Sequence, residues 1–199
     1  LPPRVLARGV QGVRVDDGLL LRELELRREH ERHGLERAVE ARVVEDRPEG
    51  VDEGSRLLLD LIHDTVSETD DCLDVGCGWG VLGMTLARLA PQGRSVMVDK
   101  DFVAVDYTRK NIERNRLGNA EVFLSNGFAQ VGERKFDLIV SNLPAKVSKE
   151  QHYLYLFDAA AHLKPGGRFV VVTINGLREF IARSFKEVFG NYDKLKQGK

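Results

Sequence analysis

Between residues 71 and 189 the sequence alternates short apolar runs with longer amphipathic stretches. This alternation is typical of successive strand-helix-strand units, because parallel strands need long crossover connections that are usually helical. It predicts a doubly wound α/β fold with a mainly parallel sheet. The expected strands are 71–75, 94–99, 121–124, 136–141 and 168–174. The expected helices are 56–63, 81–89, 102–117, 150–163 and 177–189.

Local signals mark the ends of several elements. Ser55 is a candidate N-cap for the first of these helices, and Asp101 is a candidate cap for the third. The sequence Lys-Pro-Gly-Gly at 164–167 predicts a turn that ends the preceding helix. Residues 10–26 alternate polar and apolar side chains around Asp-Asp-Gly at 16–18, which favours a hairpin.

Length and composition fit one domain. The chain has 199 residues, and we expect an N-terminal extension over 1–50 followed by an α/β domain over 51–199. No apolar run approaches the ~20 residues of a membrane-spanning helix, so no membrane contact is expected. Cys72 and Cys77 have neither the number nor the spacing of a zinc site or a disulfide framework. This favours a reducing, cytoplasmic setting and no bound metal.

The charge balance limits the classes of partner. Lys and Arg total 30 against 31 Asp and Glu, which gives a formal net charge of -1. Long nucleic acids are held mainly through neutralisation of their phosphates, so this composition argues against tight nucleic-acid binding by the domain alone. Local basic patches remain compatible with it. We expect recognition of a large substrate to involve the N-terminal segment, a partner or a preassembled particle.

A glycine-rich loop follows the first strand of the alternating region and opens the next helix. It reads Asp-Val-Gly-Cys-Gly-Trp-Gly over residues 74–80. Glycines let the backbone adopt positive φ and approach a ligand closely, and the helix N-terminus offers free N–H groups. The residues expected beside a cofactor here are Asp74, Gly76, Cys77, Gly78 and Gly80.

The spacing of this loop narrows the kind of cofactor. A dinucleotide fingerprint has its third glycine one position after Gly80, where Val81 stands. The Asp74 carboxylate suits a cation and repels a pyrophosphate. Both features favour S-adenosylmethionine (AdoMet), whose ammonium and sulfonium groups are positive. A nicotinamide cofactor is the weaker alternative.

Polar residues after the next two strands extend the predicted nucleoside site. Asp99 ends the second strand 23 residues after Gly76, which suits a carboxylate that accepts both ribose hydroxyls, and Lys100 follows it. After the third strand, Asn126 and Gly127 stand where a polar group can pair with the adenine edge. An ordinary turn explains this Asn equally well.

Together these motifs resemble the small-domain family of class I AdoMet-dependent methyltransferases, from about residue 51 to the C-terminal end. The resemblance is carried by residues 51–59, the loop 74–80, Ser125-Asn126 and the sequence Ser-Asn-Leu-Pro-Ala at 141–145. It implies a Rossmann-like sheet of the seven-stranded type and AdoMet as the cofactor. For the best-known members of the family it also implies methylation of guanine N2 in ribosomal RNA.

The resemblance further implies an acceptor site. In the family, Asn-Pro-Pro and an aromatic residue end the fourth strand and hold a planar amino group, and here the motif is Asn142-Leu143-Pro144-Ala145. The Asn142 side-chain oxygen and the Leu143 carbonyl can accept the two amino hydrogens. Pro144 forces Leu143 into an extended conformation. We therefore expect Asn142, Leu143 and Pro144 to be catalytic, with Asn142 also facing the cofactor.

The alanine in this motif is a departure from the family pattern. Ala145 supplies no ring for stacking on a flat base, which is worth ~1–3 kcal/mol. By position, Trp79, Phe128 and Tyr153 are candidates to supply one, and Phe128 is also a candidate to flank the adenine ring. The departure leaves the substrate class open.

The resulting prediction is an N-methyltransferase that acts on the exocyclic amino group of a base in RNA, with RNA or a ribosomal particle as its partner. Two alternatives stay open. One is transfer to a protein glutamine amide or a small molecule, which uses the same pair of hydrogen-bond acceptors. The other is a non-catalytic module that only binds the cofactor or docks. The oligomeric state is not predicted.

The far edge of the sheet is a separate expectation. The family usually ends with an antiparallel pair of strands, and residues 191–196 leave room for only the first of them. We therefore predict that this edge is incomplete or mobile at its C-terminal end. A seventh strand supplied by residues 10–26 would contradict this prediction.

Overall fold

The structure, a computed structural model, describes residues 11–14, 53–63, 65–143 and 147–194, and the structural statements below concern these residues. The strands are β1 (Gln11–Arg14), β2 (Cys72–Val75), β3 (Ser95–Asp99), β4 (Ala120–Leu124), β5 (Phe136–Asn142), β6 (Leu163–Thr173) and β7 (Asp193–Lys194). The helices are α2 (Glu53–Ile62), α3 (Val81–Leu89), α4 (Phe102–Asn115), α5 (Lys149–His162) and α6 (Arg178–Phe189), with a 3-10 turn η1 (Asn175–Leu177) before α6.

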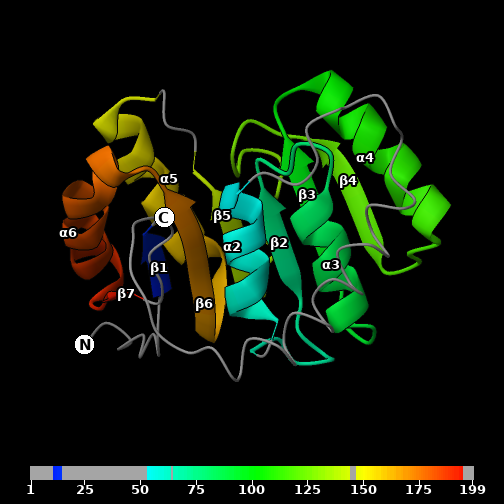
Figure 1. Cartoon of the computed structure of the whole chain (residues 1–199), viewed down its shortest axis with the longest axis horizontal. Coiled ribbons are helices and arrows are strands. Elements are labelled where there is room, and N and C mark those ends of the chain that lie inside the picture. Colours follow the sequence, from blue (N-terminus) through cyan, green and yellow to red (C-terminus); the bar gives the residue numbers. More distant parts are fainter. Residues whose placement is uncertain (1–10, 15–52, 64, 144–146, 195–199) are drawn as a thin grey trace.

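The strands form one sheet in the order β4-β3-β2-β5-β6-β1-β7, and each pair of neighbours is parallel (Figure 1). From β2 the chain moves outward to β3 and β4, and then returns to β5 on the other side of β2. The predicted doubly wound α/β fold is therefore confirmed. In such a sheet, ligands bind beyond the carboxyl ends of the strands where the order reverses, which here is between β2 and β5.

Helices cover both faces of the sheet (Figure 1). On one face α2 and α3 bury Leu58 and Met84 against the strands, and α4 packs over β3 and β4. On the other face α5 and α6 pack together, and Phe185 of α6 stacks on Phe169 of β6 with ring centroids 5.7 Å apart. In the described part of the chain, no helix is long and apolar enough to cross a membrane.

Most predicted boundaries agree with the structure within two residues, but two local predictions are wrong. Helix α2 begins at Glu53, so Ser55 lies inside its first turn and is buried instead of capping it. A cap is worth only ~1 kcal/mol, and packing of the helix on the sheet outweighs it. The predicted turn at 164–167 is part of β6, because Leu163 already pairs with Phe136 and the register shifts just after this pair. Gly166 accommodates the irregularity with a φ of +82°.

The prediction of an incomplete sheet edge is also wrong. Residues Gln11–Arg14 form β1, which pairs in parallel with β6 on one side and with β7 on the other. An unpaired edge at β6 would leave a row of N–H and C=O groups without partners, and β1 satisfies them. The hairpin predicted over 10–26 and the chain end after Lys194 lie outside the described residues, apart from β1 itself.

Candidate functional site

Asp74 lies on β2 and is buried at the switch point, with 1% of its surface exposed. Its Oδ2 accepts a hydrogen bond from the backbone N–H of Gly83 in the first turn of α3, at 2.9 Å, whereas its Oδ1 has no hydrogen-bond partner. Burial raises the pKa of Asp74 to about 7; the Gly83 N–H opposes this shift, and the charge of Asp99 adds to it. One carboxylate oxygen therefore anchors α3, and the other is left for a cation or a donor.

The loop between β2 and α3 depends on its glycines. The three glycines Gly76, Gly78 and Gly80 have φ values of +77°, +56° and +91°. Residues other than glycine rarely adopt these values. At Gly80 an added Cβ would also lie 2.6 Å from Thr108 Cγ2. The N–H groups of Gly76 and Cys77 donate to the Val98 carbonyl of β3, at 2.8 and 3.0 Å. The loop is therefore held close to the end of the neighbouring strand.

Asp99 and Lys100 lie at the carboxyl end of β3, beside this loop. Asp99 Oδ2 accepts from the Gly78 N–H at 2.9 Å, and Oδ1 accepts from the Asp101 N–H at 2.9 Å. A carboxylate has about four acceptor positions, so two remain for ribose hydroxyls. Asp101 caps α4 through the Val103 N–H at 2.8 Å, which confirms that prediction. Lys100 is exposed.

Two residues of α4 that the sequence did not single out hold the loop from outside. Thr108 Oγ1 donates to the Gly78 carbonyl at 2.8 Å, and Asn111 Nδ2 donates to the Trp79 carbonyl at 3.0 Å. Both residues are fully buried. The sequence could have indicated that Thr108 is buried, because Val105, Thr108 and Ile112 have the spacing of residues on one face of a helix.

The segment after β4 holds the two predicted adenine-site residues. Gly127 has a φ of +58°, and its carbonyl accepts from Ser125 Oγ at 2.7 Å. The Asn126 backbone N–H donates to Gln130 Oε1 at 3.1 Å, and Asn126 is exposed. The segment is a closed turn at the carboxyl edge of the sheet. Whether Asn126 contacts a nucleoside stays a prediction.

The three aromatic residues that were candidates for stacking on a base are poorly placed for this role. Phe128 is buried in the core with 4% of its surface exposed, so the prediction that it stacks on a base or flanks adenine is wrong. The Tyr153 hydroxyl donates to Glu187 Oε2 of α6 at 2.9 Å, and its ring lies 5.1 Å from the ring of Phe157. Trp79 is half-buried against the core beneath α2 and α3.

Asn142 comes to the same edge as Asp74. In the pairing of β2 with β5, Asp74 is opposite Val140. Asn142 stands two residues later, so its side chain points to the same face as Asp74, about 7 Å further along the strand. The Leu143 N–H donates to the Val172 carbonyl of β6 at 2.9 Å, and the Leu143 side chain is buried. Pro144 and Ala145 lie outside the described residues.

Tyr155 of α5 connects the parts of this site from the opposite face of the sheet, and no sequence pattern indicated its role. Its hydroxyl donates to the Val75 carbonyl at 3.3 Å and lies 3.2 Å from Ser141 Oγ, which itself donates to Val75 at 2.7 Å. Its ring meets Phe128 edge-on at 5.2 Å. Burial raises the pKa of the Tyr155 hydroxyl, so it is protonated at neutral pH. One side chain thus ties together the ends of β2 and β5.

The remaining titratable groups do not suggest other chemistry. Cys77 is buried, its Sγ donates to the Gly78 carbonyl at 3.7 Å, and burial raises the pKa of its thiol, so it is not a thiolate nucleophile. Within the described ranges no three His, Cys, Asp or Glu side chains gather where they could hold a metal ion. The site is therefore built from a glycine loop, carboxylates and amide groups.

The fold and this site together define a class of protein. It comprises doubly wound α/β domains of the class I methyltransferase type, with a glycine loop after the strand that corresponds to β2 and an Asn motif at the end of the strand that corresponds to β5. Within it, the chain belongs to the methyltransferase small domain family, whose model matches residues 48–199.

Individual relatives agree with this assignment. The chain is 35% identical over 153 residues to ribosomal RNA small subunit methyltransferase C of Salmonella choleraesuis (strain SC-B67), a match that covers 75% of this chain and 43% of the relative. It is also similar to the structure of T. thermophilus 16S rRNA N2 G1207 methyltransferase (RsmC) in complex with AdoMet and guanosine, with a TM-score of 0.64 and 30% identity over 73% of this chain and 40% of that one. A methyltransferase from Pyrococcus furiosus shares the fold, with a TM-score of 0.62 and 22% identity over 83% of this chain and 87% of that one. The chain thus spans less than half the length of the first two relatives.

Proposed function

We propose that this chain binds AdoMet and transfers its methyl group to an amino nitrogen. The observation that carries the proposal is the buried Asp74, whose Oδ1 has no partner at the switch point of the sheet. An unpartnered buried carboxylate oxygen is costly, and a cationic ligand offsets that cost. AdoMet carries two positive groups, and the T. thermophilus relative was solved in complex with it.

The residues proposed to hold AdoMet lie along the carboxyl edge of β2, β3, β4 and β5. Asp74 and the loop residues would hold its amino-acid part, Asp99 and Lys100 the ribose, and the turn after β4 the adenine. The full set is Asp74, Gly76, Cys77, Gly78, Gly80, Asp99, Lys100, Asn126, Gly127 and Asn142.

The acceptor side of the proposal rests on Asn142, Leu143 and Pro144. AdoMet supplies a methyl group that is already activated on a positively charged sulfur. The chain therefore has mainly to orient the acceptor nitrogen, and orientation is worth ~7–11 kcal/mol. The Asn142 side-chain oxygen and the Leu143 carbonyl accept the two amino hydrogens, which turns the nitrogen lone pair toward the face that Asp74 shares. As the nitrogen–carbon bond forms, the sulfur–methyl bond breaks with its electron pair left on sulfur, and the methylated nitrogen then releases its extra proton to water, so no residue has to act as a general base.

For the substrate, we propose guanine N2 in ribosomal RNA, as free RNA or in a ribosomal particle. The names of both relatives support this choice, because one is a small-subunit ribosomal RNA methyltransferase and the other methylates N2 of G1207 in 16S rRNA. A cytoplasmic location, where ribosomes are assembled, is part of the same proposal.

The proposal is tested by calorimetry with AdoMet, followed by transfer of tritiated methyl groups to ribosomal RNA from cells that lack this protein. We expect saturable AdoMet binding and label in the RNA fraction. Asn142→Ala should lower transfer about 10²–10³-fold, as loss of one oriented polar group in an active site does. The AdoMet dissociation constant should rise by a much smaller factor, because Asn142 is only one of the residues proposed to hold the cofactor.

The two alternatives give different results in the same assay. Label in the protein or small-molecule fraction, with unlabelled RNA, would replace the RNA proposal by the amide or small-molecule alternative. AdoMet binding with no label in any fraction would indicate a docking module. A chain that does not bind AdoMet, or that binds a nicotinamide cofactor instead, would overturn the whole proposal.

A further inference from the structure

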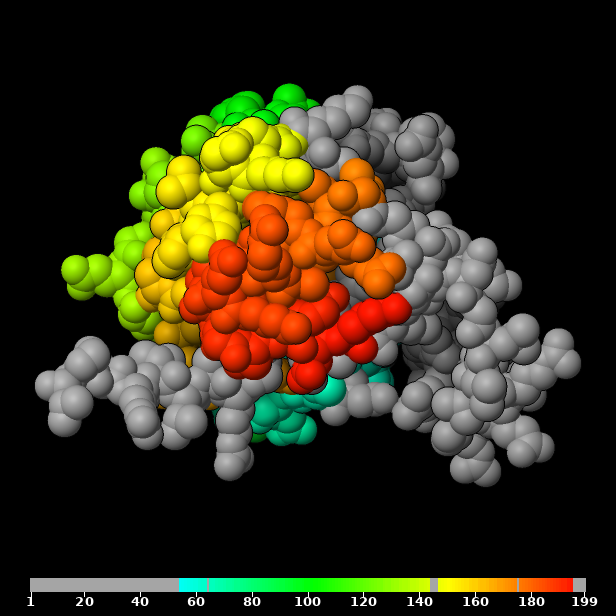
Figure 2. Space-filling view, turned by 90° about the vertical axis from the view of Figure 1, so that its left-hand side faces the viewer, coloured from blue at the N-terminus to red at the C-terminus, as the bar shows by residue number. Residues whose placement is uncertain are grey.

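A basic hollow lies between α6 and β7, on the side of the molecule that faces the viewer in Figure 2. Its volume is about 410 Å³, and four of its seven lining residues are basic while one is acidic. The basic residues are Arg178, Arg183, Lys186 and Lys194. In a chain with a net charge of -1, this is a local concentration of positive charge that the composition does not reveal.

Three of the four basic residues of this hollow have no close ion pair within the described part of the chain. Arg178 and Lys186 make no ion pair there, and Arg183 makes only a long one to Glu187 at 3.9 Å. On α4, by contrast, Lys110 Nζ forms a close ion pair with Asp106 at 2.6 Å, and Arg109 lies 4.0 Å from the same carboxylate. Unneutralised cations at the rim of a hollow attract an anion.

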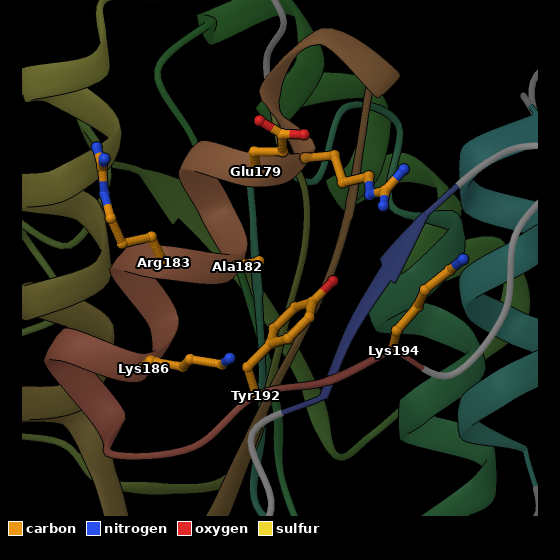
Figure 3. Close-up of a pocket in the computed structure, with 7 residues that line it drawn as sticks. Glu179, Ala182, Arg183, Lys186, Tyr192 and Lys194 are labelled. Atoms are coloured by element: carbon orange, nitrogen blue, oxygen red, sulfur yellow. The ribbon is translucent and has the colours of Figure 1, made fainter.

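A tyrosine ring occupies the middle of the hollow. Figure 3 shows the ring of Tyr192 between Lys186 on one side and Lys194 on the other, while Arg183 points away from it. The ring meets Phe185 edge-on with centroids 6.0 Å apart, which fixes it against the core. Burial raises the pKa of the Tyr192 hydroxyl. The positive charge of Arg178 is close enough to oppose this shift, but its effect is smaller.

The hollow is connected to the proposed acceptor site. Helix α6 follows η1 and β6, and β6 pairs with β5 up to Asn142. The first turn of α6 also contacts the start of α5, because Lys149 Nζ lies 5.8 Å from the centre of the Phe180 ring. Lys149 begins the helix that follows the acceptor motif. The first turn of α6, which carries Arg178 of the hollow, thus packs against the start of the helix that follows the acceptor motif, so an RNA strand whose target base is held near Asn142 can extend toward the hollow.

We propose that the α6–β7 hollow binds the sugar-phosphate backbone of the substrate RNA beside its target base, with Arg178 and Lys186 on phosphates and the Tyr192 ring stacked on an unpaired base. Basic side chains to phosphate and aromatic rings to unstacked bases are the usual contacts of proteins with single-stranded RNA. An acidic protein segment would use the cations but not the flat, anchored ring. The inference rests on the proposed function, since it assigns the RNA contact of that same site.

The test measures the affinity of the full chain for small-subunit ribosomal RNA by filter binding at several salt concentrations. The variant is R178Q/K186Q, and the matched control is R109Q/K110Q on α4. We expect the variant to bind RNA at least about tenfold more weakly and its slope of log K against log salt to fall by about 1.4, which is 0.7 for each of two phosphates on a single strand. The control should change neither quantity.

Two further variants separate the ring from the charge. Tyr192→Leu should weaken RNA binding about 5–150-fold with the salt slope unchanged, because stacking is worth ~1–3 kcal/mol and involves no phosphate. Tyr192→Phe keeps the ring and should bind as the unaltered chain does. All variants should keep the AdoMet affinity and the turnover at saturating RNA, which shows that they fold and that the methyl-transfer site is intact.

The outcomes distinguish this inference from the proposed function. If the unaltered chain methylates ribosomal RNA and R178Q/K186Q matches it in affinity and slope, the hollow is not the RNA contact and the proposed function stands. If RNA binding depends on the hollow but no label enters RNA, the hollow is supported and the proposed reaction fails. If the unaltered chain neither binds nor methylates RNA, both are overturned.

Discussion

At the scale of single residues, Asp74 couples the stability of the protein to pH. Its pKa is raised from 3.8 to about 7 by burial, so between these values the folded state holds a proton that the unfolded state releases. Since the unfolded state then binds fewer protons, the contribution of Asp74 to the free energy of unfolding falls as pH rises through this window. Above pH 7 the ligand-free protein carries the full cost of a buried charge.

The first prediction is that Asp74→Asn stabilises the ligand-free protein at alkaline pH. The amide keeps an oxygen for the Gly83 N–H but does not ionise. Between pH 5 and pH 8 the stability of the variant relative to the unaltered chain should rise by about 2–3 kcal/mol. Urea unfolding at the two pH values measures this change. If the difference in free energy of unfolding between the variant and the unaltered chain stays constant or shrinks as pH rises, Asp74 is not buried as a carboxylate.

The same substitution should weaken AdoMet binding, because it removes the negative charge proposed to meet the cofactor. Gain of stability together with loss of affinity is not expected of a purely structural residue. Asp106→Asn is a suitable control, since Asp106 is partly exposed on α4 and its ion pairs within the described residues are with neighbouring cations of that helix. Calorimetry should find the AdoMet affinity of this control unchanged.

The hydroxyl of Tyr155 supports a second prediction. Tyr155→Phe keeps the ring contact with Phe128 but removes the bond to the Val75 carbonyl. We expect a loss of about 1 kcal/mol in the free energy of unfolding. We also expect a larger fall in turnover than in AdoMet affinity, because the hydroxyl joins the strand end that carries Asn142 to β2.

Tyr153→Phe is the matched control for Tyr155→Phe, since both residues lie on α5. The Tyr153 hydroxyl donates to Glu187 on the surface of α6 and does not contact β2 or β5. It should therefore leave turnover unchanged. Equal effects of the two substitutions on turnover would argue against a positioning role for Tyr155.

At the scale of elements, the glycine loop depends on α4 as much as on its own sequence. A third prediction follows: Thr108→Val removes the bond to the Gly78 carbonyl while it preserves the shape of the side chain. It should weaken AdoMet binding more than it slows transfer at saturating AdoMet. Titration calorimetry and steady-state kinetics with AdoMet as the varied substrate measure the two effects.

The control for Thr108→Val is Thr85→Val in α3. Thr85 is also buried, but its hydroxyl bonds to Val81 within its own helix and does not contact the loop. Its removal should affect stability only. If both substitutions change AdoMet affinity to the same degree, the bond from α4 to the loop has no specific role.

The sequence correctly predicts those features of the fold and of the site that are determined by residues close together in the chain. The glycine loop at a strand-helix junction, the helix from Val81 to Leu89 and the cap at Asp101 are all encoded by neighbouring residues, and the structure has them where they were expected. The bonds that Tyr155 and Thr108 make span 80 and 30 residues along the chain. No local pattern contains such contacts, because they depend on the packing of helices on the sheet.

The sheet edge shows the same limit for whole elements. β1 is separated from its partner β6 by about 150 residues of chain, and the alternation over residues 10–26 favoured a local hairpin but did not indicate this distant partner. Its pairing is decided by the open edge that β6 presents and not by local preference. The basic hollow escaped prediction for a related reason, since α6 and β7 contribute its cations from either side of a turn.

At the scale of the whole molecule, the carboxyl end of the sheet carries the proposed ligand site, whereas the amino end carries an ion network that stabilises the fold. The carboxyl end carries Asp74, Asp99 and Asn142, and the buried Asp74 carboxylate, with one oxygen unpartnered, lowers the stability of the ligand-free protein. The amino end carries a compact ion network in which Lys164 Nζ lies 2.7 Å from both Asp71 Oδ2 and Asp137 Oδ2. This network joins the start of β2, the start of β5 and β6.

On the acid side the network responds to pH in the direction opposite to Asp74, because its contribution falls as pH falls. Burial acts to raise the pKa of Asp71, but the Lys164 ammonium and the Arg94 N–H outweigh it and the pKa is lowered. Hydrogen bonds to Asp137 and Asp71 raise the pKa of Lys164. The network therefore stabilises the fold fully between about pH 4 and pH 10, and its contribution is lost as pH falls through the lowered pKa of Asp71 or rises through the raised pKa of Lys164.

The last prediction uses this separation of tasks. Lys164→Met leaves Asp71 and Asp137 facing each other without a cation, and because the network is about one-third exposed we expect a loss of only about 1–2 kcal/mol at pH 7. The loss should shrink as pH falls through the lowered pKa of Asp71. Lys110→Met, which removes the cation of a solvent-screened pair on α4, should cost much less than Lys164→Met. AdoMet affinity and turnover should be unchanged in both variants under conditions in which they are folded, because the network lies at the end of the strands opposite to the proposed site. A Lys164→Met protein that is stable but inactive would mean that the two ends of the sheet are coupled.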